Sequence, residues 1–130
     1  MSWQTPVFDR TAADVAARAD KCYFSAALLN RIEGNTAVLA QAFGTDYIPR
    51  SWAETDFLTP TGMQHLLAGL AAVRAAYYTL PTTPAVPALP AVRYDAVNDI
   101  EHIQHDLYTL HRRNTDPDRL LYAGQTIGVI

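Results

Sequence analysis

Apolar residues recur at three- and four-residue spacing in three stretches of the chain, which is the pattern of helices that bury one face. The first stretch lies between Ser25, which can cap a helix, and Gly44, which can end one in a left-handed conformation. Its mostly apolar stripe consists of Leu29, Ile32, Thr36, Leu39, Ala40 and Phe43. The pattern predicts a helix of roughly five turns here.

Two further long helices are predicted after it. Thr59 and Pro60 form a start signal, because Thr caps well and Pro loses no hydrogen bond at the first helical position. This helix ends before Pro81. The third is predicted to begin with Asp95 as its cap and to run to about Arg112.

A shift of 34 positions carries the first stripe onto the other two helices. The corresponding positions are Leu29, Met63 and Val97; Ile32, Leu66 and Ile100; and Leu39, Val73 and Leu107. The first and third helices also share Asn-x-x-Glu, because Asn30 and Glu33 reappear as Asn98 and Glu101. A true structural repeat and a chance match are both compatible with so short a motif.

The remaining segments are predicted to connect or flank these helices. Residues 1–10 form an extended arm, Thr11 and Asp14 cap a short helix over Ala12–Ala19, and residues 81–90 form a proline-rich crossover. Residues 119–130 form a short extended or β segment. The predicted fold is therefore mostly α: one domain over residues 1–130, a small bundle of three long helices with a short N-terminal helix.

Composition limits the function classes. The chain has 130 residues, 49% of them hydrophobic, a net charge of -3 and a single Lys, which argues against bulk electrostatic binding to nucleic acid. The longest apolar run, residues 66–80, is too short to span a membrane and contains Arg74. Cys22 is the only cysteine, so an internal disulfide is excluded. The first residues lack the basic and apolar runs of a secretory signal.

Two groups of residues invite a chemical interpretation. His102 and His105 lie one helical turn apart and are candidate metal ligands, although further ligands are not evident. Glu33 and Glu101 are a candidate acid–base pair if their helices are adjacent. The interpretation that we favour is structural: Asn30, Glu33, Asn98 and Glu101 bond to neighbouring backbone and fix helix register.

Several short motifs together resemble small tail- or baseplate-associated structural proteins of tailed phages and prophages of Gram-positive bacteria. They are an N-terminal Trp-x-x-Pro arm, Asp9-Arg10-Thr11, Leu29-Asn30-Arg31-Ile32-Glu33-Gly34-Asn35, Trp52 with Asp56, Asn98-Asp99-Ile100-Glu101, and Leu121-Tyr122-Ala123-Gly124. One departure is Leu28, where that family usually has Asp.

The resemblance implies a non-enzymatic subunit or adaptor, made in the host cytoplasm and located in the virion, with no cofactor. Its expected partners are copies of itself and other tail or baseplate proteins, and neither nucleic acid nor membrane. The residues expected to form the assembly interface are Trp3, Val7, Phe8, Trp52, Leu121, Tyr122, Ile127 and Ile130. A small helical regulatory or assembly-chaperone protein of a phage, and a His-ligated metal protein, are the alternatives.

Overall fold

The computed structural model describes residues 3–115, and this part of the chain is mostly helical. Its elements are α1 (Ala12–Ala16), a short 3-10 helix η1 (Asp20–Cys22), α2 (Ala26–Phe43), α3 (Pro60–Ala76) and α4 (Tyr94–Thr115). The three long helices pack against one another in all three pairings. The predicted helical bundle is therefore confirmed, whereas the predicted extended segment at residues 119–130 lies outside the described residues.

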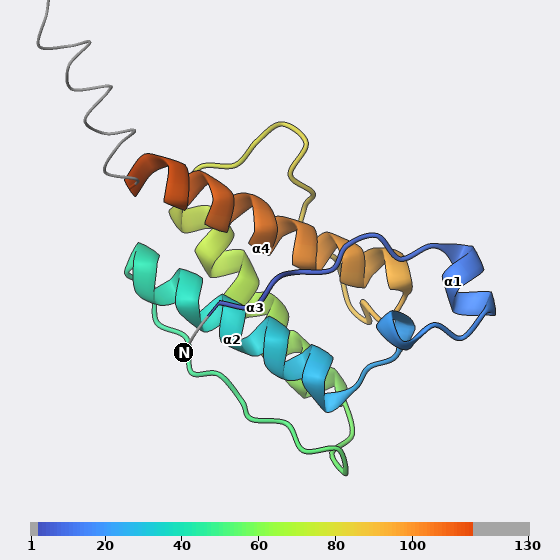
Figure 1. Ribbon diagram of the computed structural model, residues 1–130. Helices are drawn as coiled ribbons and strands as arrows, with labels where there is room; N and C mark the ends of the chain where they lie inside the picture. The colour runs from blue at the N-terminus through green and yellow to red at the C-terminus, as the bar shows by residue number, and fades with distance from the viewer. Residues whose placement is uncertain (1–2, 116–130) are drawn as a thin grey trace, which may run out of the picture.

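The long helices run in the same general direction, as Figure 1 shows. Each connection between them must therefore return along the length of the bundle. One return is the strap, residues 45–58, between α2 and α3; another is the crossover, residues 77–93, between α3 and α4. The arm, residues 3–10, passes over α2 and α4, and α1 lies at the edge of the molecule outside the bundle (Figure 1).

Side-chain caps set the starts of α2 and α3 where the sequence predicts them. The Ser25 hydroxyl accepts a hydrogen bond from the Leu28 amide at 3.1 Å, and the Thr59 hydroxyl accepts one from the Gly62 amide at 3.1 Å. These bonds satisfy amides of the first turn that have no partner within the helix. At the other end of α2, Gly44 adopts the left-handed conformation with φ 76°.

The other two helices differ from the prediction at their boundaries, and α4 also extends beyond the predicted end near Arg112, to Thr115. The Thr11–Asp14 capping box forms, but α1 ends at Ala16 because the chain turns at Arg18, whose φ is 58°. In α4, Asp95 lies within the first turn and is not the cap, because the Val97 amide bonds to the Arg93 carbonyl and the helix begins at Tyr94. Asp is favoured both at the N-cap and in the first turn of a helix, so its presence alone does not fix where the helix begins.

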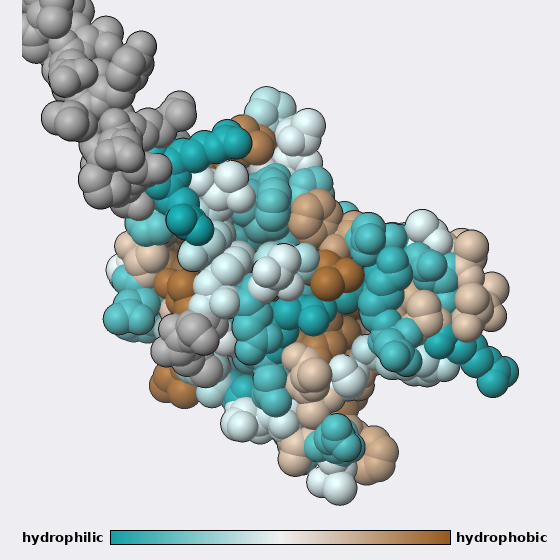
Figure 2. All heavy atoms as spheres, viewed as in Figure 1, coloured by the Kyte–Doolittle hydropathy of each residue, from teal (hydrophilic) through white to brown (hydrophobic). Residues whose placement is uncertain are grey.

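The core lies where the three stripes meet. All nine positions related by the 34-residue shift are at most 4% exposed. The periodic pattern thus identified the buried faces of all three helices. On the face that carries the arm, hydrophilic residues predominate and hydrophobic ones are scattered among them (Figure 2).

Candidate functional site

The two Asn-x-x-Glu motifs fasten extended segments to the bundle. On α2, the Asn30 side chain accepts a hydrogen bond from the Trp52 amide at 2.8 Å and donates one to the Trp52 carbonyl at 2.9 Å. One turn further, Glu33 accepts a bond from the Trp52 indole Nε1 at 3.0 Å. Asn therefore holds the backbone of one strap residue, and Glu holds the side chain of the same residue.

The Asn-x-x-Glu motif of α4 binds the arm in the same way. Asn98 accepts a hydrogen bond from the Arg10 amide at 3.1 Å and donates one to the Arg10 carbonyl at 2.8 Å. One turn on, Glu101 Oε2 lies 2.8 Å from Arg10 Nη2 in a buried ion pair. We call an asparagine that bonds both backbone groups of one residue an Asn clamp; Asn30 and Asn98 are two of them.

A third Asn clamp holds the beginning of the arm. Asn35 on α2 accepts a hydrogen bond from the Gln4 amide at 2.9 Å and donates one to the Gln4 carbonyl at 2.8 Å. The Asn35 side chain is fully buried. The arm is thus clamped from α2 at Gln4 and from α4 at Arg10.

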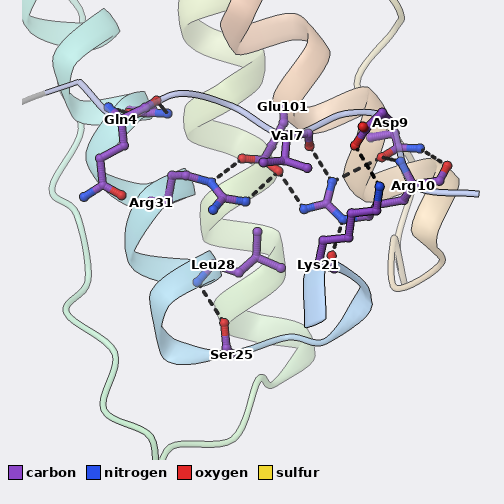
Figure 3. Close-up of polar contacts among 11 residues, drawn as sticks. Gln4, Val7, Asp9, Arg10, Lys21, Ser25, Leu28, Arg31 and Glu101 are labelled. Carbon is purple, nitrogen blue, oxygen red and sulfur yellow. Dashed lines mark hydrogen bonds and ion pairs between the residues drawn. The ribbon is translucent and has the colours of Figure 1, made fainter. Parts of the chain in front are cut away.

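Glu101 is the centre of a buried ionic cluster that joins the arm, α2 and α4. Besides Arg10, it contacts Arg31 of α2, whose Nε lies 2.6 Å from Oε1 and whose Nη2 lies 3.0 Å from Oε2 (Figure 3). Arg10 also donates to the carbonyls of Lys21 and Val7. Because the Glu101 carboxylate faces two guanidinium groups that donate several bonds, the cost of burying these charges is offset.

Glu33 is buried without a comparable ion pair. Its carboxylate accepts hydrogen bonds from Trp52 Nε1, from the Arg50 amide at 3.1 Å and from the Tyr47 hydroxyl. Burial raises the pKa of the Glu33 carboxyl, an effect that the bonds from Trp52 and Arg50 oppose. Glu33 and Glu101 hold different segments through different partners, and no contact joins the two carboxylates among the described residues.

The described residues of the expected assembly interface contact their own chain. Trp3 stacks on Tyr108 with ring centroids 3.9 Å apart, and Phe8 stacks on His102 with centroids 4.8 Å apart. Val7 is partly buried, and Trp52 is only 4% exposed. Leu121, Tyr122, Ile127 and Ile130 lie outside the described residues.

The two candidate metal-binding histidines flank a buried carboxylate. His102 Nε2 lies 3.4 Å from Asp106 Oδ2, and His105 Nδ1 lies 3.2 Å from Asp106 Oδ1. Asp106 also accepts a hydrogen bond from the Thr83 hydroxyl at 2.7 Å, which anchors the crossover to α4. Within residues 3–115, no three His, Cys, Asp or Glu side chains are arranged to hold a metal ion.

Sequence reasoning missed other polar residues that join segments. Gln104 is fully buried on α4, and its side-chain amide donates to the Ile32 carbonyl and to the Thr36 hydroxyl, both at 2.9 Å. Arg74 donates from α3 to the Pro84 carbonyl of the crossover at 3.0 Å. Gln104 shares the apolar stripe of α4, and a polar residue at a stripe position is the one signal that marks it.

The fold and these contacts define a class: a three-helix bundle whose connecting and flanking segments are held by buried and partly buried polar side chains. No family model matches the chain, and no curated protein and no solved structure matches it either. Of the helices within residues 3–115, none is both long and apolar enough to cross a membrane.

Proposed function

We propose that this protein is a non-enzymatic structural subunit or adaptor of a phage or phage-like tail or baseplate, which acts by assembling with copies of itself and with neighbouring tail proteins. The observation that carries the proposal is a set of large apolar side chains left in solvent: Tyr78 is 76% exposed, Ile48 83% and Phe57 85%. Two of these side chains, Tyr78 and Phe57, are aromatic, and aromatic residues are enriched at protein interfaces.

The residues behind the family resemblance support the same proposal. Asn30, Glu33, Asn98 and Glu101 are central to the resembling motifs, and they are the side chains that fasten the strap and the arm. Arg10 and Trp52 also belong to the resembling motifs, and they are the arm and strap residues to which these side chains bond. Motifs with an architectural role are what a shared structural protein would be expected to retain.

The identity of the particle is tested by quantitative mass spectrometry of purified tailed particles, induced from the source strain. We expect the chain in a fixed ratio to a known tail component, at a small-integer multiple that reports its symmetry. The matched control is a lysate fraction of the same strain that contains no particles.

A chain that is abundant in the lysate but missing from intact particles would overturn the structural role. That result would instead favour an assembly chaperone or a regulator, because such proteins act before the particle is complete.

A further inference from the structure

The arm is bound to the bundle as a separate peptide would be. Its contacts are two Asn clamps on its backbone, at Gln4 and Arg10, the buried Arg10–Glu101 ion pair, and two stacked aromatic pairs. We call the side of α2 and α4 that makes these contacts the arm-binding surface. It consists of Asn35, Asn98, Glu101, His102 and Tyr108.

The chain between the arm and α2 is fastened much less firmly. In this connector, residues 11–24, no residue is fully buried, and neither α1 nor η1 contains a buried residue. The contacts that it makes with the arm and the core lie at its last residues, where Lys21 contacts Arg10 and Asp9 of the arm and Phe24 packs against the core. Two of its apolar side chains, Val15 and Tyr23, are 46% and 51% exposed. The arm therefore binds the bundle through its own contacts, and the connector that joins the two is largely exposed.

We propose that neighbouring copies of this protein exchange arms, so that residues 3–10 of one copy lie on the arm-binding surface of another. The contacts between the arm and the arm-binding surface are the same in either arrangement, because the arm and the surface are identical in every copy. The two arrangements differ in the path of the connector. The equilibrium between an arm on its own bundle and an arm on a neighbouring copy therefore depends on the concentration of the copies. This inference rests on the self-assembly part of the proposed function.

The connector is long enough for this exchange. Its 14 residues span up to about 3.3–3.6 Å each when extended, or roughly 45–50 Å together, more than the roughly 33 Å length of the 22-residue α4.

The test uses the full chain and a photoreactive residue on the arm. Thr5 is exposed, so Thr5→p-benzoylphenylalanine should leave the clamps at Gln4 and Arg10 in place. This chain is mixed with an unmodified chain carrying a mass tag, and both are unfolded, refolded together and irradiated. We expect a mixed two-chain product whose linkage maps to α2 or α4 of the tagged chain.

The matched control adds Arg10→Ala to the photoreactive chain, which removes the ion pair from the arm and leaves the tagged chain's surface intact. The mixed product should then fall several-fold. Sedimentation in parallel separates the two proposals. If sedimentation shows that the chains associate but every cross-link lies within a single chain, arm exchange is overturned and self-assembly is not. A monomer at every concentration, with no mixed product, would overturn both.

Discussion

At the scale of the residue, one short motif does the same task in two places. Because Asn and Glu in Asn-x-x-Glu lie about one turn apart, both face the same neighbouring segment, one bonding its backbone and the other its side chain. Trp52 and Arg10 are held in this way although one side chain is aromatic and the other is a charged guanidinium. The Asn clamp bonds only to backbone groups, which explains how the same motif can hold either residue.

The buried carboxyl of Glu33 predicts how stability depends on pH. Burial raises its pKa above the ordinary value of 4.5, so the folded protein keeps this proton at pH values where the unfolded chain has lost it. The free energy of unfolding should therefore fall as pH rises from about 4.5 through the folded-state pKa. In Glu33→Gln, which cannot ionise, this part of the decline should be absent.

Urea unfolding of both proteins across this pH range measures the effect. Asp99 also has a raised pKa, caused by burial and by Asp95, but it is present in both proteins and drops out of the difference. Parallel stability curves for the two proteins would show that Glu33 ionises in the folded state as it does in the unfolded chain.

At the scale of the element, local signals predicted the helices well. Ser25, Gly44, Thr59 and Pro60 lie at the predicted boundaries because caps act within one turn of sequence. The buried faces were predictable for the same reason, since helical periodicity needs no knowledge of the partner.

The partners of the polar motifs were not predictable. Asn98 meets Arg10 across 88 positions of sequence, and Glu33 meets Trp52 across 19. The Glu33–Trp52 pairing follows from the shared direction of the long helices, which sends the strap back along the bundle (Figure 1). The Asn98–Arg10 pairing follows from the path of the arm over α2 and α4. The sequence pointed to Asn30, Glu33, Asn98 and Glu101 as residues that bond to neighbouring backbone and fix helix register, but it did not show that they hold the arm and the strap.

Two helix glycines offer a matched test of how closely the strap lies on α3. An added Cβ at Gly34 in α2 meets no atom within 4 Å, so Gly34→Ala should stabilise the protein by about 0.5–1 kcal/mol through helix propensity. At Gly69 in α3, the Cβ would overlap the Tyr47 ring, which also stacks on His65. Gly69→Ala should destabilise by roughly 1–3 kcal/mol, because the strap must move.

Chemical denaturation of the two variants gives both values. Equal stabilisation by both substitutions would mean that Tyr47 does not pack against Gly69 in solution.

At the scale of the whole molecule, the segments between the helices contribute to the fold as structural parts. The arm contributes an aromatic stack on α4, a clamp from α2 and a buried ion pair. These contacts predict that the arm contributes to stability as well as to any assembly.

Deleting residues 1–8 should lower the free energy of unfolding by about 2 kcal/mol or more. The loss combines a clamp of two hydrogen bonds, each about 0.5–1.5 kcal/mol, with the Trp3–Tyr108 stack at roughly 0.5–1.5 kcal/mol. Thermal and urea unfolding measure it, with Thr5→Ala as the control because Thr5 is exposed. An unchanged unfolding midpoint would show that the arm does not rest on the bundle.

The most direct test of the fastening role is hydrogen exchange of the Arg10 and Trp52 backbone amides, followed by NMR in the wild type, Asn98→Ala and Asn30→Ala. Each amide donates to one clamp, Arg10 to Asn98 and Trp52 to Asn30. Both amides should be protected in the wild type, and each substitution should release its own amide while the other stays protected. If the Arg10 amide exchanged equally fast with and without Asn98, the clamp on the arm would be contradicted.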